Sequence, residues 1–259
     1  MCCFIFIIFI SYNILYNRWD NIWHRCKPMP YYENSKNLDD TIRIGFIGDS
    51  WAYLHHVCLI DTFLETQLRK YLNKPIKVVS KGENGEITRE IYKNMFKDGN
   101  NGTKSIIRSG LDYCIISAGI NDAGGNLGEE QYCYHYRLII DFLHHNKISP
   151  IIIEIPDACI WNARENKPLK EIAIDYIRSF MTKSPMYNCS SYRNSLYSML
   201  VSDKSMQQII YIPLSEWNGN EKTIKKELCL SDQIHLNIKG YEKLDSCIVR
   251  KIINKRENH

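Results

Sequence analysis

The chain has 259 residues, enough for one sizeable domain and a short extra segment but too few for two full domains. Hydrophobic residues make up 44% and charged residues 24% of it, proportions typical of a globular protein, which excludes wholesale disorder. The net charge is +4, with Lys and Arg scattered and the densest basic run, Lys222 to Lys226, flanked by Glu221 and Glu227, so no nucleic-acid partner is expected.

The chain opens with an apolar run over residues 2–16 that has no polar face. The run is short against the ~20 residues that span a bilayer, but a helix that is apolar all round is unsuited to a water-exposed surface. No basic segment precedes it and no small-residue cleavage site follows it, which favours a retained transmembrane anchor over residues 1–17. Because Arg18, Arg25 and Lys27 follow the run, the domain is expected in the cytoplasm, with the periplasmic or extracellular side left open.

Residues 18–40 contain Pro and Asn and lack an apolar period, which predicts a linker before a folded domain over residues 41–259. The ten cysteines form no CxxC pair, and several lie in apolar runs, as Cys114 does. Free thiols are therefore expected, with a disulfide set as the alternative if the domain is exported.

From Thr41 onward, short β-rich runs alternate with longer helical patterns. Five apolar strands separated by helices predict an α/β fold with a parallel sheet covered on both faces, and such sheets place their sites at the carboxyl ends of the strands. The strands are expected over residues 42–47, 76–79, 113–117, 151–155 and 209–212, and the helices over residues 57–72, 88–96, 129–145, 169–181 and 238–253, with an extra helix near 192–200.

Polar residues follow the first and third predicted strands. The first strand runs into Gly48-Asp49-Ser50, which places a serine where the chain turns toward the next helix. Alone, this tripeptide equally fits a turn or a helix cap. The third strand ends before Asn121, whose amide is expected at the same edge of the sheet, where it can donate to a developing oxyanion.

Two further segments complete the pattern. The second strand leads into a loop whose glycines, Gly82 and Gly85, allow the backbone to approach a ligand, although an ordinary turn explains them as well. Near the C-terminus, Asp232 precedes His235 by three residues, a spacing that suits a base and its orienting carboxylate. Alternatively, Asp232 and Asn237 are loop and cap residues and the histidine is incidental.

In this order, the four segments resemble the GDS, glycine, GxND and DxxH blocks of the SGNH (GDSL-like) hydrolase superfamily, over about residues 42–253. The resemblance implies a flavodoxin-like, three-layer α/β/α sandwich with five parallel strands, preceded here by the hydrophobic N-terminal helix, and with no cofactor. By the same resemblance, Ser50 is the nucleophile, His235 its base and Asp232 the orienting residue. The Ser50 and Gly85 N–H groups and the Asn121 amide form the oxyanion hole, with Gly82 as an alternative to Gly85.

Other residues near these segments have weaker interpretations. Trp51 replaces the usual residue after the serine and either packs in the core or borders the acyl pocket. His55 and His56 have no acidic or thiol partner at ligand spacing, so no metal site is expected. Glu154 ends the fourth strand and either lines a pocket or pairs with a helix terminus or a lysine.

The resemblance implies a serine esterase that forms an acyl-enzyme on Ser50 and acts on a small-molecule or glycan ester. Deacetylation of a carbohydrate is one such reaction, favoured by aromatic side chains expected in loops, Tyr53, Trp161 and Tyr192. The alternatives are an acyltransferase that acts on a glycan and a non-catalytic binding module of the same fold. The sequence leaves the oligomeric state open.

Overall fold

The computed structural model describes residues 25–35, 39–158, 160, 167–206 and 208–257, together with positions 5, 8 and 11. Five strands form one parallel sheet in the order β2-β1-β3-β4-β5. The strands are β1 (Ile42–Gly48), β2 (Ile76–Gly82), β3 (Tyr113–Ser117), β4 (Ser149–Ile153) and β5 (Ile210–Ile212). The register pairs Gly48 with both Gly82 and Ser117, so β1, β2 and β3 end level with one another.

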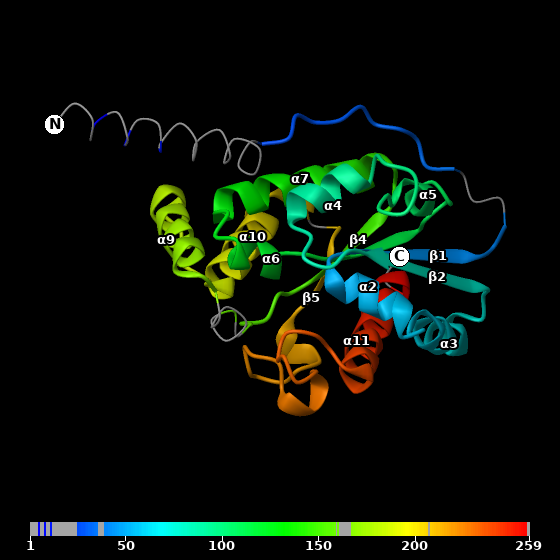
Figure 1. Ribbon diagram of the computed structural model, residues 1–259. Helices are drawn as coiled ribbons and strands as arrows, with labels where there is room; N and C mark the ends of the chain where they lie inside the picture. Colours follow the sequence, from blue (N-terminus) through cyan, green and yellow to red (C-terminus); the bar gives the residue numbers. More distant parts are fainter. Residues whose placement is uncertain are drawn as a thin grey trace.

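Helices cover both faces of this sheet, which gives three layers (Figure 1). One face carries α2 (Ser50–Val57), α3 (Asp61–Leu72) and α11 (Ile238–Glu257). The other carries α4 (Thr88–Asn94), α5 (Lys104–Ile107), α6 (Ile120–Gly124), α7 (Glu129–His145) and α10 (Cys189–Ser202), while α9 (Leu169–Thr182) lies at the edge of the molecule. Three 3-10 turns, η1 (Lys204–Met206), η2 (Leu214–Glu216) and η3 (Lys226–Leu228), flank β5 and the segment that follows it.

The core lies between the sheet and its helices because the inner strands are apolar on both faces. Ile44, Phe46, Ile115 and Ile151 are completely buried, as expected for strands sandwiched between two helical layers. The apolar faces of the surrounding helices close this core, with Leu64 of α3 among the fully buried side chains. The predicted α/β sandwich is therefore confirmed.

The main error in the predicted elements concerns the helix after β1. The sequence predicts one helix over residues 57–72, whereas the structure has α2 and α3, separated by a break at Cys58, Leu59 and Ile60. Leu59 adopts a left-handed conformation with φ of 58°, which ends α2 although its side chain continues the apolar pattern. The other predicted elements are present, β3 and α7 with the predicted bounds and the rest with shifted ends, and the extra helix expected near 192–200 is α10.

The predicted N-terminal anchor lies outside the described residues, apart from positions 5, 8 and 11. In the part of the chain that the structure describes, no helix is both long and apolar enough to cross a bilayer. Residues 25–35, part of the predicted linker, run extended along α4 and α7: the Met29 amide donates to the Tyr92 hydroxyl (2.8 Å) and the Asn34 amide to Asn146 (2.6 Å). The predicted division of the chain into an anchor up to residue 17, a linker up to residue 40 and a folded domain stays a prediction.

Candidate active site

Ser50 is the first residue of α2, directly beyond the carboxyl end of β1. Gly48 makes this tight exit possible, because its φ of 154° suits glycine and a Cβ atom there would lie 2.2 Å from the Ser117 carbonyl oxygen. Asp49 caps the helix: its carboxylate accepts from the Trp51 amide (3.0 Å) and from the Ser117 hydroxyl (3.0 Å). Burial raises the pKa of Asp49 to about 6, against the effect of these bonds.

The structure brings Ser50, His235 and Asp232 into one hydrogen-bonded chain. The Ser50 hydroxyl lies 2.8 Å from His235 Nε2, and His235 Nδ1 lies 2.6 Å from Asp232 Oδ2. Because an ionised carboxylate only accepts, Nδ1 carries the ring proton and Nε2 is left to accept from the serine. This is the arrangement that activates a serine for nucleophilic attack.

Asp232 also organises the loop that carries the histidine. Its other oxygen, Oδ1, accepts from the backbone amides of Ile234 (2.9 Å) and His235 (3.0 Å). Partial burial opposes ionisation of Asp232, but the hydrogen bonds from His235 and the two amides outweigh it and lower the pKa of the carboxyl. The alternative interpretation of Asn237 as a cap residue is confirmed, because its side chain accepts from the Gly240 amide (3.0 Å) in the first turn of α11.

Trp51 connects the serine helix to the histidine loop. The ring is buried and packs edge to face against Trp217, at 6.2 Å between centroids, so the core-packing interpretation of this residue is confirmed. In addition, the indole N–H donates to the carbonyl oxygen of Ile234 (3.1 Å), the residue before His235. The Tyr241 hydroxyl of α11 donates in turn to the Trp51 carbonyl oxygen (2.9 Å), which also ties α2 to the helix after the loop.

The two candidate glycines have different positions. A Cβ atom on Gly82 would lie 2.2 Å from the Asp49 carbonyl oxygen and 2.6 Å from that of Gly48, so Gly82 is needed for close contact between the strand ends. Gly85 has a φ of 79°, no atom within 4 Å of a hypothetical Cβ, and lines the same cleft as Ser50. The structure thus favours Gly85 for contact with a ligand.

Asn121 lies on α6 and lines this cleft together with Ser50 and Gly85. Its amide nitrogen donates to the Glu86 carbonyl oxygen (2.9 Å), which fixes the side chain and leaves its second N–H for another acceptor. The neighbouring Asp122 is buried and accepts from the Thr88 amide (3.0 Å) and hydroxyl (2.9 Å). The glycine loop and α6 are therefore held together directly behind the cleft.

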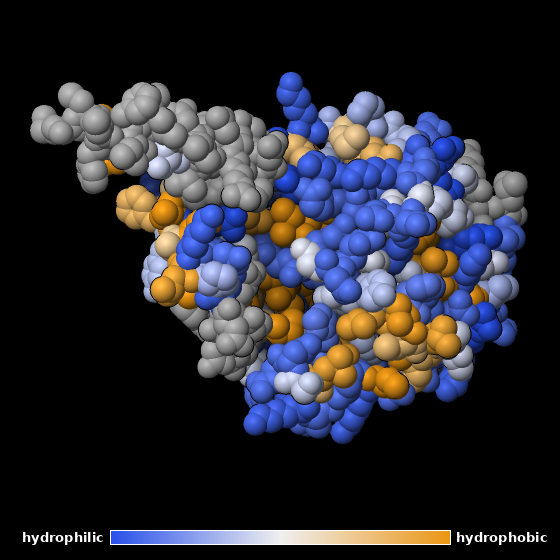
Figure 2. Space-filling model, viewed as in Figure 1, coloured by the Kyte–Doolittle hydropathy of each residue, from blue (hydrophilic) through white to orange (hydrophobic). Residues whose placement is uncertain are grey.

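The cleft has a volume of about 470 Å³ and combines polar and apolar lining. In Figure 2 it corresponds to the hollow with orange side chains at its base, between α6 and α2. Its apolar lining residues are Leu54, Ile120, Ile160, Leu230 and Ile234. A larger groove of about 930 Å³ lies along α3 and α11 and contains none of the motif residues.

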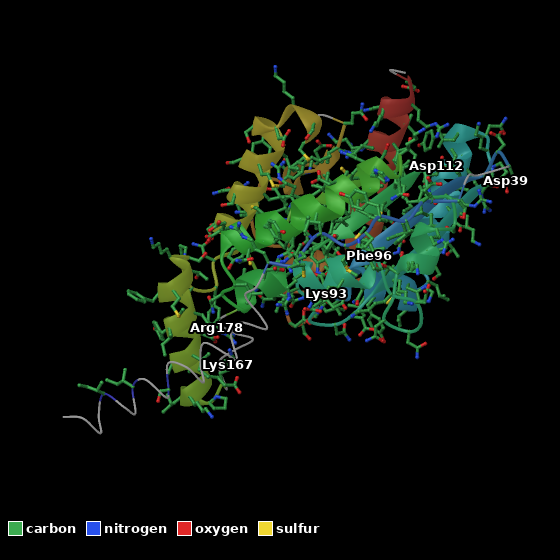
Figure 3. The ribbon with its side chains drawn as sticks, turned by 90° about the horizontal axis from the view of Figure 1, so that it is seen from above. Asp39, Lys93, Phe96, Asp112, Lys167 and Arg178 are labelled. Carbon is green, nitrogen blue, oxygen red and sulfur yellow. The ribbon has the colours of Figure 1, made fainter. Side chains whose placement is uncertain are left out.

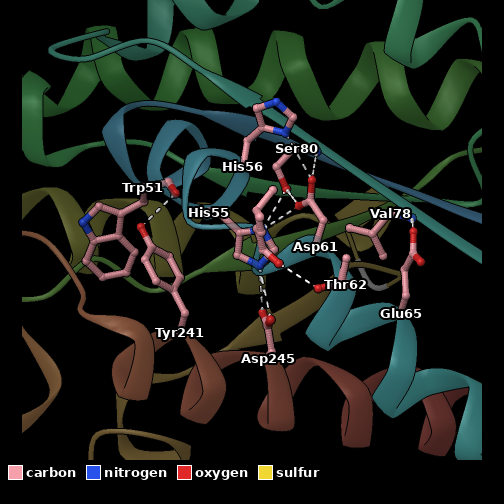
Figure 4. Close-up of polar contacts among 11 residues, drawn as sticks. Trp51, His55, His56, Asp61, Thr62, Glu65, Val78, Ser80, Tyr241 and Asp245 are labelled. Atoms are coloured by element: carbon pink, nitrogen blue, oxygen red, sulfur yellow. Dashed lines mark hydrogen bonds and ion pairs between the residues drawn. The ribbon is translucent and has the colours of Figure 1, made fainter.

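Sequence reasoning missed a buried network around His55 (Figure 4). His55 Nδ1 lies 2.7 Å from Asp61 of α3 and 2.8 Å from the Ser80 hydroxyl of β2, and Nε2 lies 3.2 Å from Asp245 of α11. Burial alone would lower the pKa of His55, but Asp245 and Asp61 together raise it to about 9. No local spacing signals this network, because His55 and Asp245 are separated by 190 residues.

The remaining candidate residues lie outside the cleft. His56 is exposed and reaches Asp61 at 3.3 Å, and among the described residues no group of three or more His, Cys, Asp or Glu side chains is arranged so that it could hold a metal ion. Glu154 accepts from the Leu214 amide (2.6 Å) and lies 3.4 Å from Arg193, so it pairs within the fold rather than lining this cleft. All seven cysteines in the described segments are free thiols.

The three aromatic residues on which the prediction of a carbohydrate substrate depends lie in different parts of the chain's structure. Tyr192 is wrong as a loop residue, because it is fully buried in α10 and its hydroxyl accepts from the Gly128 amide (2.7 Å). Tyr53 lies on α2 and is 39% exposed. Trp161 falls outside the described residues.

Comparison with solved structures identifies similar folds at low sequence identity. A GDSL-like lipase from Bacteroides thetaiotaomicron is 16% identical, with a TM-score of 0.53 over 93% of this chain and 98% of the lipase. The esterase EstA from Pseudoalteromonas sp. is 13% identical, with a TM-score of 0.55 over 85% and 100%. The acetylxylan esterase Axe2 from Geobacillus stearothermophilus is 15% identical, with a TM-score of 0.56 over 85% and 96%.

The chain shares the α/β fold of these lipases and esterases. No protein-family model matches the sequence, and no curated protein matches it significantly. At these identities the likeness concerns the fold, which agrees with the fold that the four motifs imply. The chemistry depends on the residues of the cleft itself.

Proposed function

We propose that the protein is a serine esterase that hydrolyses a carboxylic ester through an acyl-enzyme on Ser50. The observation that carries this proposal is the hydrogen-bonded chain from Ser50 through His235 to Asp232, with its serine end in the cleft. The fold it shares with known esterases supports the same reaction class.

The proposed reaction assigns a part to each of these atoms. Ser50 Oγ attacks the acyl carbonyl carbon while its proton passes to His235 Nε2, and Asp232 stabilises the imidazolium that results. The carbonyl oxygen becomes an oxyanion, which accepts from the Ser50 and Gly85 N–H groups and the Asn121 amide. His235 then returns the proton to the departing alcohol, and a water molecule, deprotonated by the same nitrogen, hydrolyses the acyl-enzyme.

For the substrate, we propose an ester with a small acyl group, such as an acetylated carbohydrate. The cleft's mixed lining suits it, because apolar side chains such as Ile120 and Ile234 can receive the acyl group while Asn84 is available to a polar alcohol. One of the similar structures is an acetylxylan esterase. The test of this substrate class is therefore the release of acetate from acetylated xylo-oligosaccharides. Activity confined to longer p-nitrophenyl acyl chains would contradict this choice of substrate.

We also propose that residues 1–17 hold the protein at a membrane with the domain in the cytoplasm, on the charge asymmetry around the apolar run. Reporter fusions after residue 259 test this orientation. A reporter active only on the exported side of the membrane would contradict the cytoplasmic placement.

The test of the esterase proposal is the steady-state hydrolysis of p-nitrophenyl acetate by the purified full chain. Ser50→Ala is expected to lower kcat by at least about 10⁴-fold, because no nucleophile remains. Ser246→Ala is the matched control, since this serine is exposed on α11 and bonds only to the Glu242 carbonyl oxygen. Equal hydrolysis by the parent and Ser50→Ala, or none by a folded parent, would overturn the proposal.

A further inference from the structure

Helix α9 carries its large apolar side chains on the molecular surface. Leu169 is 85% exposed and Phe180 84%, with Tyr176 and Ile177 also exposed, whereas Asp175 is the buried residue of this helix. At 3.6 residues per turn, Leu169, Ala173, Tyr176, Ile177 and Phe180 share one face, which we call the α9 surface. A helix of a globular protein normally turns such a face toward the core, whereas α9 turns it toward solvent.

Polar contacts on the opposite side hold α9 in this orientation. Asp175 forms an ion pair with Lys167, accepts from the Tyr187 hydroxyl and lies 3.6 Å from Arg178. Arg178 donates at 3.5 Å to the carbonyl oxygen of Gly125, directly after α6. Figure 3, which labels Lys167 and Arg178, shows α9 standing apart from the helical layers around the sheet.

The α9 surface has the features of an interfacial helix. Figure 2 shows orange side chains along the outer edge of α9, at the left of the view. Lys170 and Lys183 are exposed near its two ends, where they can contact anionic headgroups. An amphipathic helix with aromatic and aliphatic residues on one face and lysines beside it binds in the plane of a bilayer surface.

The described stretch that starts at Arg25 begins beside the same helix. Arg25, at the start of a described stretch, pairs with Glu130 in the first turn of α7. The adjacent Glu129 accepts from the Ser184 hydroxyl, two residues beyond the end of α9. Arg25, where this described stretch of the chain begins, therefore lies near the C-terminal end of α9.

We propose that the α9 surface is a membrane-contacting surface that lies in the headgroup region of an anionic lipid bilayer. Two other occupants fit less well. A second copy would gain little, because a 14-residue helix is about 21 Å long and offers far less than the ~600 Å² per partner of a stable interface. Residues 2–16 are apolar all round, so α9 could cover only one side of them.

The experiment measures amide hydrogen exchange in the full chain with and without vesicles of phosphatidylglycerol and phosphatidylcholine in equal parts, because residues 1–17 alone are proposed to hold the chain on the vesicle. In the parent, vesicles are expected to slow exchange in residues 169–183 by at least about tenfold, and L169E/F180E is expected to lose this slowing, because two apolar side chains no longer enter the interface. The control Y71E/V201E places two glutamates at exposed apolar positions on α3 and α10 and is expected to keep the slowing in residues 169–183 that vesicles cause in the parent.

Three results would overturn the proposal. The first is equal slowing of exchange in residues 169–183 by vesicles in L169E/F180E and the parent, or no slowing in either. The second is a dimer of the parent in lipid-free solution that L169E/F180E abolishes. The third is a lower Tm of L169E/F180E without vesicles, together with exchange in residues 169–183 that is as slow in the lipid-free parent as in the vesicle-bound parent, which would mean that residues 2–16 pack on α9. Hydrolysis of p-nitrophenyl acetate in solution is expected to be unchanged by L169E/F180E, so this proposal and the esterase proposal fail separately.

Discussion

At the scale of single residues, the side-chain amide of Asn121 bonds within the fold through one N–H and is proposed to bind the oxyanion through the other. One N–H of its amide is held by the Glu86 carbonyl oxygen, and the other is free to face the cleft. Such a fixed donor stabilises a transition state more than a ground state, since it is already oriented when negative charge develops on the substrate oxygen.

Asn121→Ala is therefore expected to lower kcat for p-nitrophenyl acetate by about 10²- to 10³-fold with little change in KM. Asn84→Ala is the matched comparison: Asn84 lines the same cleft on the proposed alcohol side and is not among the oxyanion donors, so its loss is expected to leave kcat for p-nitrophenyl acetate nearly unchanged. If both variants lost activity equally, or if Asn121→Ala raised only KM, the role given to the Asn121 amide would be wrong.

The indole N–H of Trp51 is expected to position His235, and this effect can be tested separately from the packing of the ring. Trp51→Phe keeps an aromatic ring in the core but removes the N–H that donates to the Ile234 carbonyl oxygen beside His235. We expect kcat to fall about 3- to 10-fold, with KM nearly unchanged, because the histidine loop loses one anchor. Unchanged kcat in a variant with the parent's Tm would show that this bond does not position His235.

These two residues mark the limit of inference from the sequence. Asn121 follows a predicted strand end, so its place near Ser50 could be predicted from the rule that parallel strands end at one edge. The bond from Trp51 joins residues 183 positions apart, and no local pattern predicts which carbonyl group an indole reaches in the folded chain. The choice between Gly82 and Gly85 likewise needed the backbone positions around Gly48 and Asp49.

At the scale of elements, His55 connects the helix that carries the serine to the rest of the fold. Through Asp61, Ser80 and Asp245 it joins α2 to α3, β2 and α11, the helix that follows the histidine loop. Removing one partner from a buried charged network leaves the others uncompensated. The free energy of unfolding of His55→Gln is therefore expected to be about 3–5 kcal/mol lower, while the exposed His56→Gln stays within about 0.5 kcal/mol of the parent.

The same network predicts a pH dependence of stability. The pKa of His55 is raised to about 9 in the folded state, above the ~6.5 of an unfolded chain. Its stabilising contribution is thus fully present below about pH 6.5 and is lost as the pH rises through 9. Urea unfolding between pH 6.5 and 9.5 should show this decline in the parent and a flatter profile in His55→Gln; parallel profiles would contradict a protonated His55.

The break between α2 and α3 shows why element boundaries escaped prediction. Residues 57–72 have a continuous helical pattern, but the chain turns at Leu59 so that Asp61 can begin a new helix and reach His55 and Ser80. The pattern reports which faces are apolar, and it does not report a turn that tertiary contacts impose.

At the scale of the whole molecule, the sheet brings distant segments to one edge. β1, β2 and β3 end level with one another, and the loop before α11 reaches the same edge, where Trp51 and Tyr241 fasten it to α2. The order of these segments was readable in the sequence because each lies next to a strand or helix with a clear apolar period. The orientation of α9 could not be predicted, because the apolar pattern of this helix predicts that its apolar face is buried, whereas the structure exposes that face.

The central claim is that this edge makes Ser50 a nucleophile, and covalent labelling of the full chain with a fluorophosphonate probe tests it most directly. Peptide mass spectrometry should find one probe adduct, on Ser50, absent from Ser50→Ala and strongly reduced in His235→Ala, with Ser246→Ala labelled as the parent is. A folded parent that takes no label, or takes it on another serine, would contradict the account.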